Sequence, residues 1–377
     1  MEFAERIGIA NGSVSKIENG RMALTDDLAQ SISSVFDCTP AYLTGPDRIG
    51  PTTRPWLRAY ADASKRAVDQ QRADCTTAVE VVDILALRQI PDTIPVFDGN
   101  LSDEDAIEQF AADVRAAAGL GDGEVVGNCI RAAERLGCLV LPMREELGRH
   151  LGLSVRANQT PVVCVARTNG GHGIPGDRQR FTVAHEIGHL GLHAGVGPPE
   201  SAHDATRYEK QAHRFAGAFL APGDALLDDL RDEGNRVTLR TLSALKRRWG
   251  VSIKALVVRF QGMGVIDDDH ARSLYKQISA RGWNKSEPVE VGGEQAIWLQ
   301  KALEKAHPGA PNSLRSASEA SGVGVSYFGR WTSWVAVDQA GDADVIALGP
   351  ITSGRTKASS ENRHGGTVRP IPLRKTH

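Results

Sequence analysis

The chain of 377 residues lacks several features that would place it in a specialised class. Its five cysteines are odd in number and scattered, without a C-x-x-C pair, which argues against a disulfide framework and a cysteine zinc site and indicates reduced thiols. No apolar run approaches the ~20 residues of a membrane-spanning helix, and residues 1–10 carry charges in place of the apolar core of a signal peptide. We therefore expect a cytoplasmic protein with no membrane partner.

The sequence also lacks a strong excess of charge of either sign. The net charge is −2, so any binding of nucleic acid must rest on a local patch of the surface. A hydrophobic content of 41% and a charged content of 24% are ordinary for globular proteins. The length predicts two or three domains.

The most informative stretch is residues 181–194, F-T-V-A-H-E-I-G-H-L-G-L-H-A. It contains the H-E-x-x-H pattern as His185, Glu186 and His189, on a predicted helix for which Asp177 is the expected N-cap. Residues four apart lie on one helix face, so both imidazoles can reach one metal ion with Glu186 beside it. This is the arrangement of a zinc site with a carboxylate that activates water. The alternative is a core helix whose histidines are hydrogen-bonded within the protein.

A second helix is predicted over Tyr208–Pro222, Y-E-K-Q-A-H-R-F-A-G-A-F-L-A-P. A catalytic zinc ion takes three protein ligands and leaves one position open. Glu209 is the best candidate for the third ligand, and Asp204 and Glu200, in the expected connecting loop, are weaker ones. We interpret His193 as structural, because it lies two helical turns beyond the first motif histidine.

Together, R-Q-R-F-T-V-A-H-E-I-G-H-L-G-L-H and E-K-Q-A-H-R-F-A-G-A-F-L-A-P resemble the ImmA/IrrE family of metallopeptidases. The resemblance implies a zincin-like domain with one Zn²⁺ per chain held by His185, His189 and Glu209, and Glu186 as the catalytic residue. The sequence departs from the family at His213, where Asn or Asp is usual; this histidine either supports a ligand or binds metal itself. Three further residues are candidates for supporting a ligand or stabilising the oxyanion: Tyr208, His172 and His203.

The N-terminal region is predicted to form short helices separated by tight turns. These helices are expected at residues 3–9, 11–21 and 26–36, with a short turn at 39–45. The string A-E-R-I-G-I-A-N-G-S-V-S-K-I-E-N-G-R resembles the Cro/CI-like (XRE) helix-turn-helix family, whose second helix enters the major groove of DNA. The resemblance implies DNA contacts from Asn11, Ser13 and Lys16 toward bases, and from Ser15, Asn19 and Arg21 toward phosphates or as caps. A helical module that binds protein is the alternative.

That family has a further helix before the position of Met1, so we expect the first helix of the domain to be missing from this sequence. Either the true start lies upstream or DNA binding is impaired. Five regions are expected: a helix-turn-helix domain at 1–46, a linker and long helix at 47–95, an ImmA/IrrE-like metallopeptidase domain at 96–287, a C-terminal helical region at 288–337 and a disordered basic tail at 338–377.

Short apolar, β-branched runs at 138–142, 151–155 and 162–167 predict a small sheet just before the metal helix. Further helices are expected at 56–88, 104–118, 125–136, 241–248 and 253–261, and within 294–306. The fold class is therefore α+β and mostly helical. We expect Val162–Ala166 to be a sheet edge to which an extended peptide adds as a strand; a core strand without a substrate role is the alternative.

Two functions follow from these patterns. In the first, the protein is an intracellular zinc endopeptidase that cleaves a transcriptional repressor or similar regulatory protein, in phage, mobile-element or stress control. DNA, bound through the N-terminal domain, and a second copy of the chain are further expected partners. In the second, it is an XRE-type regulator whose peptidase-like domain is a sensor or dimerisation module with little catalysis. The intact residues His185, Glu186, His189 and Glu209 favour the first.

Overall fold

The computed structural model describes residues 2–46, 50, 52–55, 64–144, 147, 150–169, 172–197, 199–308, 310 and 312–334. The chain divides into a unit of residues 1–339 and a unit of residues 340–377, and every described residue belongs to the first. The predicted basic tail at 338–377 lies outside the described residues, and so do positions 56–63 of a predicted helix.

The described part of the chain is mostly helical with a small sheet, which confirms the predicted fold class. The helices are α1 (Glu2–Arg6), α2 (Asn11–Glu18), α3 (Asp26–Val35), α4 (Pro40–Thr44), α5 (Lys65–Ile84), α6 (Glu104–Ala117), α7 (Cys129–Arg135), α8 (Gly176–Leu192), α9 (Ala202–Leu220), α10 (Gly223–Asp232), α11 (Leu239–Trp249), α12 (Ile253–Gly262), α13 (Asp268–Ala280), α14 (Trp298–Ala306), α15 (Ser313–Ser321) and α16 (Val325–Thr332). The strands are β1 (Leu139–Pro142), β2 (Gly152–Ala157), β3 (Thr160–Val165), β4 (Thr168–Asn169) and β5 (His172–Gly173). Among the described helices, none is long and apolar enough to cross a membrane.

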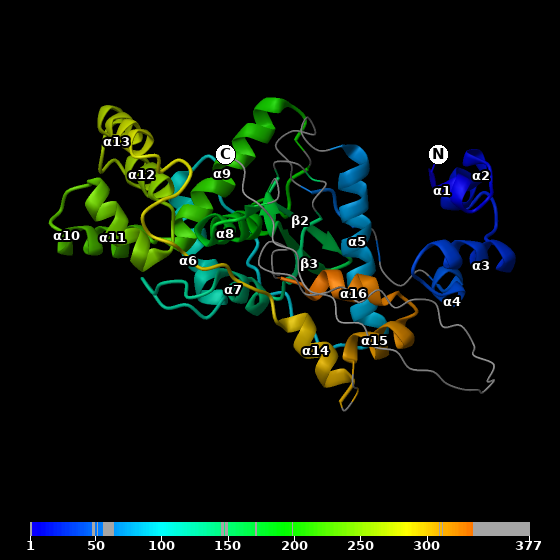
Figure 1. Ribbon diagram of the computed structural model, residues 1–377. Helices are drawn as coiled ribbons and strands as arrows, with labels where there is room; N and C mark the ends of the chain where they lie inside the picture. Colours follow the sequence, from blue (N-terminus) through cyan, green and yellow to red (C-terminus); the bar gives the residue numbers. More distant parts are fainter. Residues whose placement is uncertain are drawn as a thin grey trace, which may run out of the picture. The chain divides into compact units, whose positions relative to one another are not determined.

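A three-stranded sheet in the order β1-β3-β2 separates two hydrophobic cores. Strand β1 runs parallel to β3, and β2 runs antiparallel to it. Because successive side chains of a strand point to opposite faces, Val163 and Val165 pack with helices α6–α13, whereas Val162 and Cys164 pack with α5 and α14–α16. Figure 1 shows α8 on one side of β2 and β3 and α5 on the other. Burial on both faces explains why the strands read as continuous apolar runs.

The expectation that residues 162–166 form a sheet edge is wrong. Residues 162–165 belong to β3, which pairs with a strand on each side, and the edge strands are β1 and β2. Strand β2 lies directly against α8: a Cβ at Gly152 would come within 2.4 Å of Thr182 Cγ2 and 2.8 Å of Glu186 Oε1. Only glycine permits this approach, so β2 is the strand that borders the H-E-x-x-H helix.

The expectation that Asp177 caps α8 is also wrong. The N-cap residue is Pro175, which makes no side-chain cap bond, and the helix begins at Gly176. Asp177 lies in the first turn, where a negative charge favours the helix, and its buried carboxylate forms an ion pair with Lys246 of α11. The sequence could not show this partner because it lies far along the chain.

Polar caps decide where other helices begin. Helix α9 starts earlier than predicted because Ser201 Oγ accepts a hydrogen bond from the backbone of Asp204 (3.1 Å), which places Asp204 inside the helix and not in a loop. Helix α7 starts later than predicted because the side chain of Asn128 accepts from Arg131 N at 2.8 Å. Ser64 caps α5 in the same way.

Candidate metal centre

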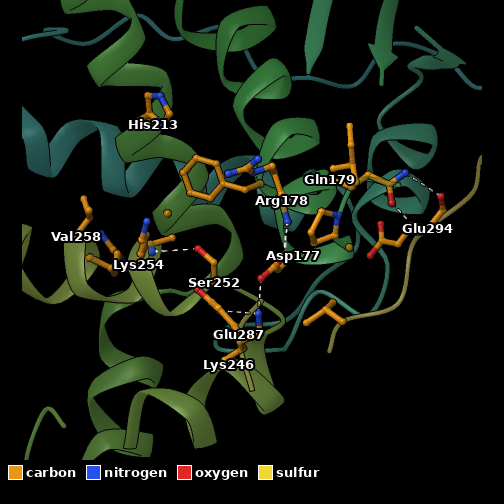
Figure 2. Close-up of a pocket in the computed structure, with 18 of the residues that line it drawn as sticks. Asp177, Arg178, Gln179, His213, Lys246, Ser252, Lys254, Val258, Glu287 and Glu294 are labelled. Carbon is orange, nitrogen blue, oxygen red and sulfur yellow. Dashed lines mark hydrogen bonds and ion pairs between the residues drawn. The ribbon is translucent and has the colours of Figure 1, made fainter. Parts of the chain in front are cut away.

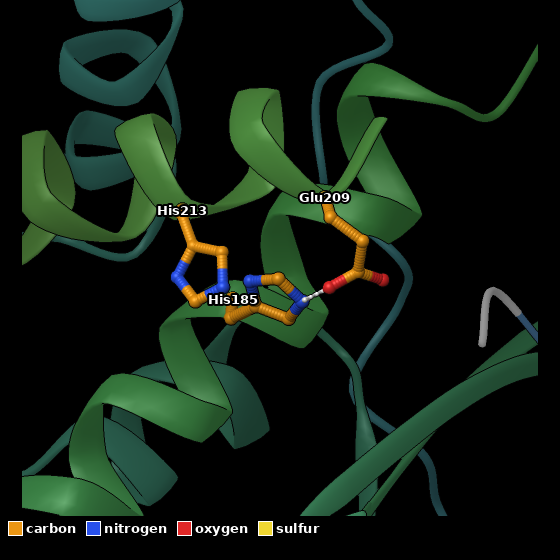
Figure 3. A group of neighbouring side chains, drawn as sticks. All are labelled: His185, Glu209 and His213. Atoms are coloured by element: carbon orange, nitrogen blue, oxygen red, sulfur yellow. Dashed lines mark ion pairs between the residues drawn. The ribbon is translucent and has the colours of Figure 1, made fainter. Parts of the chain in front are cut away.

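Helices α8 and α9 pack against each other and bring the predicted ligands together. His185 and His189, one turn apart on α8, face each other with their Nε2 atoms 3.1 Å apart. Glu209 of α9 reaches both. Its Oε2 lies 3.5 Å from His185 Nε2, a contact that Figure 3 shows. Its Oε1 lies 3.6 Å from His189 Nε2. The helices approach closely because Gly188 has no side chain; a Cβ there would lie 2.8 Å from Cδ1 of Phe215. The structure thus gathers three donor groups at one place.

A chain of hydrogen bonds fixes which nitrogen of His189 carries its proton. The carbonyl of Leu101 can only accept, so the atom of Gln211 that lies 2.7 Å from it must be the amide nitrogen, and the amide oxygen accepts from His193 Nε2 at 3.1 Å. His193 Nδ1 is then an acceptor, and His189 Nδ1 donates to it across 2.9 Å. The lone pair of His189 Nε2 is left to face Glu209 and His185. This is the tautomer that a metal ligand needs.

Electrostatics keep His189 neutral and Glu209 charged, the forms in which these two groups bind a cation. Burial lowers the pKa of His189 to about 3, against the opposing effect of Glu209, so its imidazole is neutral at physiological pH. Burial alone would raise the pKa of Glu209, but its contacts with His185 and His189 hold that pKa below its usual range, so the carboxylate is charged. Burial opposes the protonated form of His185, yet Glu209 and Glu186 raise its pKa. The cluster therefore attracts positive charge.

The donor set fits a zinc ion. Nitrogen ligands of tetrahedral zinc lie ~2.0–2.1 Å from the metal, which puts two of them about 3.3 Å apart. The separation between His185 and His189 is 3.1 Å. The carboxylate of Glu209 and Nε2 of His189 both accept, and His185 Nε2 lies within reach of both. A cation satisfies all three groups.

The carboxylate of Glu186 lies on the β2 side of the same helix. Ser154 Oγ, on β2, donates to Glu186 Oε2 at 2.6 Å, and the whole pair is buried. Burial raises the pKa of Glu186 to about 7, while His185 and the hydrogen bond from Ser154 act in the opposite direction. A carboxylate with this pKa exchanges protons readily near neutral pH.

The four remaining predicted residues occupy different places. His213, on α9 four residues after Glu209, offers a ring nitrogen within 4.8 Å of ligand atoms of both His185 and Glu209, and Figure 3 shows its ring beside that of His185. The ring of Tyr208 lies 5.0 Å from that of His193. The other two are exposed, on β5 and in the first turn of α9: His172 and His203. The roles predicted for these four residues stay predictions.

A groove with a volume of about 1900 Å³ opens beside the cluster. Its walls come from α8, α9, α11, α12 and the segment 283–295, and Figure 2 shows part of its lining. Of the four donor residues, His213 lines the groove, whereas His185, His189 and Glu209 lie behind it. The groove therefore reaches the metal centre at His213.

Comparison with known families gives two matches. Residues 133–261, which include α8, α9 and every candidate metal ligand, match the family model of the IrrE N-terminal-like domain, a peptidase family. Residues 2–43 match that of the helix-turn-helix family. The chain carries a helix-turn-helix domain and an IrrE N-terminal-like domain. Comparison with curated proteins gives no match.

In the helix-turn-helix domain, the predicted second helix is α2, and none of its residues is buried. Gly8, with a φ of 71°, makes the turn that follows α1. Asn11 and Lys16 are exposed, as a recognition helix requires. Asn19 Nδ2 donates to the carbonyl of Ser15 at 2.6 Å, so this pair ends the helix, which was one of the two roles expected for it. The DNA contacts of all six residues stay predictions.

In the IrrE N-terminal-like domain, the sequence did not reveal Ser154 or Gln211 as parts of the site. Ser154 lies in an apolar strand with no motif around it, and only the packing of β2 on α8 brings it to Glu186. Gln211 lies in the second motif helix, two positions after Glu209, and that position was the only available signal. Both residues hold the reactive side chains in place.

Proposed function

We propose that this protein is an intracellular zinc endopeptidase that cleaves a transcriptional repressor or similar regulatory protein in phage, mobile-element or stress control. We also propose that its helix-turn-helix domain binds DNA. The observation that carries the proposal is the convergence of His185, His189 and Glu209, with Glu186 held beside them. The free state of the cysteines agrees with a reducing compartment.

The zinc ion would be held by His185, His189 and Glu209. When bound, such an ion polarises a substrate carbonyl and lowers the pKa of a water toward ~7. Glu186 takes the proton of the attacking water on Oε1, because Ser154 engages its Oε2. The same carboxyl then delivers the proton to the amine that leaves. Ser154 holds the carboxylate in one orientation during both transfers.

The experiment that tests this proposal is Glu186→Gln in the full chain. The amide cannot take up the proton, so cleavage of the regulatory substrate should fall by roughly 10²–10⁴ while zinc content and fold are unchanged. Glu209→Ala should lower both zinc content and cleavage, since it removes a ligand. Zinc is measured by elemental analysis of purified protein, and cleavage by mass spectrometry of a repressor encoded beside the gene.

Glu200→Gln is the matched control. Glu200 is exposed in the loop before α9, and no described residue forms an ion pair with it, so its amide should leave zinc and cleavage unchanged. Full cellular function in Glu186→Gln, together with its loss in Lys16→Ala, would instead identify a DNA-binding regulator with a sensory zinc site. Stoichiometric zinc in a His185→Ala, His189→Ala double variant would overturn the metal site itself.

A further inference from the structure

The groove beside the metal centre is larger than a small-molecule site. Its volume of about 1900 Å³ exceeds the ~300–1,000 Å³ of pockets that enclose a drug-sized ligand. It contacts the donor cluster at His213, and Phe181 of α8 lies 5.5 Å, ring to ring, from His213 at the same point. A groove of this size that borders the candidate metal centre suits an extended polymer and not a compact molecule.

One wall of the groove is fixed in place by its own acidic residues. Glu287 accepts from Lys246 Nζ at 2.7 Å and from the backbone of Ile253 at 2.9 Å. Glu294 forms a buried ion pair with Arg180 and accepts from the backbone of Ile130 at 2.9 Å. Segment 283–295 is therefore held to α11, α12, α8 and α7 through Glu287 and Glu294. The negative charges of these two carboxylates are balanced by Lys246 and Arg180.

The cations of the groove are not neutralised to the same extent. Arg178 of α8, Lys210 of α9, Lys254 of α12 and Lys285 of segment 283–295 line the groove and are exposed. None of these four makes an ion pair with a described carboxylate. Among the carboxylates described in the lining, Glu290 alone likewise lacks an ion pair. The groove thus carries an excess of positive charge although the whole chain has a net charge of −2.

Apolar surface accompanies these cations. Val258 of α12 is 59% exposed and lines the groove one helical turn from Lys254, as Figure 2 shows. Phe181 and Trp283 line it as well and are only half-buried. An occupant that covers these side chains and also pairs with the cations must combine apolar and acidic groups.

We infer that this groove binds the substrate of the proposed peptidase as an extended protein segment in which acidic side chains alternate with apolar ones. The inference rests on the proposed function and adds the chemical class of the substrate. Charge complementarity selects the segment and raises the rate of encounter, and the apolar contacts hold it against the wall. The segment enters along Lys254 and Arg178 and reaches the metal centre past His213.

The test uses the zinc-loaded full chain with Glu186→Gln, which binds a peptide without cutting it. Fluorescent peptides of about ten residues, ~33 Å when extended, carry Leu and Val in alternation with either Asp and Glu or their amides Asn and Gln. Fluorescence anisotropy at low salt should show the acidic peptide binding about tenfold or more tightly than the amide peptide, with the difference shrinking as salt rises.

Charge reversal in the groove supplies the decisive comparison. Lys254→Glu with Lys285→Glu should weaken binding of the acidic peptide by about tenfold and leave the amide peptide within about twofold. Lys301→Glu with Lys305→Glu is the matched control, because both lysines are exposed on α14 and lie outside the groove. Thermal melts and zinc content confirm that each variant is folded and loaded.

Equal binding of the acidic and amide peptides, or an equal loss in the control pair, would overturn the inference. So would a single-stranded oligonucleotide that outcompetes the acidic peptide and depends on Lys254 and Lys285, since the occupant would then be a nucleic acid. The proposed function fails separately, if the wild-type chain cleaves no regulatory protein while the groove still discriminates between the peptides. Normal cleavage of the regulatory protein by the charge-reversed variant would contradict substrate binding in the groove. It would leave the proposed peptidase function intact.

Discussion

At the residue scale, the site depends on side chains that do not themselves bind the metal. A chain of hydrogen bonds runs from the carbonyl of Leu101 through Gln211 and His193 to His189. It fixes the tautomer of His189, because the backbone carbonyl at its end can only accept. His193 therefore has a structural role, as its place in the sequence indicated. Its partner Gln211 was found only in the folded chain.

We expect Gln211→Leu to raise the Kd for zinc by roughly 10- to 100-fold, the usual effect of removing a residue that orients a ligand. Gln211→Glu should fall between wild type and Gln211→Leu, because it still accepts from His193. Competition with a chromogenic chelator measures the Kd. Gln300→Leu, at an exposed glutamine on α14, is the control. Equal zinc affinity in Gln211→Leu and wild type would show that this chain of hydrogen bonds does not position His189.

At the element scale, the close packing of β2 on α8 positions Glu186, the proposed proton-transfer group. We expect Gly152→Ala to push the carboxylate of Glu186 aside, because the added Cβ would lie 2.8 Å from Glu186 Oε1 and 2.4 Å from Thr182 Cγ2. Cleavage should fall by tenfold or more while zinc content stays near one per chain, at a stability cost of about 1–3 kcal/mol. Gly195→Ala is the control, since nothing lies within 4 Å of its added Cβ and it lies outside the groove lining. Unchanged cleavage in Gly152→Ala would mean that Glu186 tolerates displacement.

A second element, α2, has no buried residue and carries four of the six predicted DNA contacts. We expect Asn11→Ala and Lys16→Ala each to weaken binding to a duplex selected from a random pool, because both residues are predicted to face base edges. Asn11→Ala should relax base preference and leave the salt slope unchanged. Lys65→Ala, at the exposed start of α5, is the control. Binding that is unaffected by both substitutions would favour a protein-binding role for this region.

At the scale of the whole molecule, the sheet under the metal centre is shared by two cores, and the C-terminal helices α14–α16 complete the second one. Trp331 is 1% exposed and donates from Nε1 to Asp74 Oδ2 of α5 at 3.2 Å. The face of the sheet opposite α8 is therefore covered by residues close to the end of the described chain. Stability of the region around the candidate metal centre therefore depends on helices α14–α16, which contribute none of its candidate ligands.

We expect Trp331→Ala to lower the free energy of unfolding by about 3–5 kcal/mol, because it leaves a cavity and removes a hydrogen bond from buried Asp74. Zinc affinity of the folded protein should change little. Chemical denaturation measures the loss. Val325→Ala, at a side chain that is 44% exposed on the same helix, should change the free energy by no more than about 0.5 kcal/mol. A similar small effect for Trp331→Ala would show that α16 is not part of the cooperative core.

The sequence by itself determined most of the elements and indicated the candidate ligands, because both are encoded locally. Helical spacing placed His185 and His189 on one face, and a second motif nearby indicated Glu209. Apolar β-branched runs identified all three strands of the main sheet. These features need no knowledge of distant contacts.

Only the tertiary structure decided what those elements pack against. It put β3 in the centre of the sheet and β2 beside α8, paired Asp177 with Lys246, and brought Ser154 to Glu186. It also gathered unpaired cations in the groove, whereas the acidic residues that balance them in the net charge lie elsewhere on the chain. Each of these outcomes joins residues that are far apart in the chain. It therefore depends on how whole elements bury their apolar faces against one another, which the local spacing of residues does not predict.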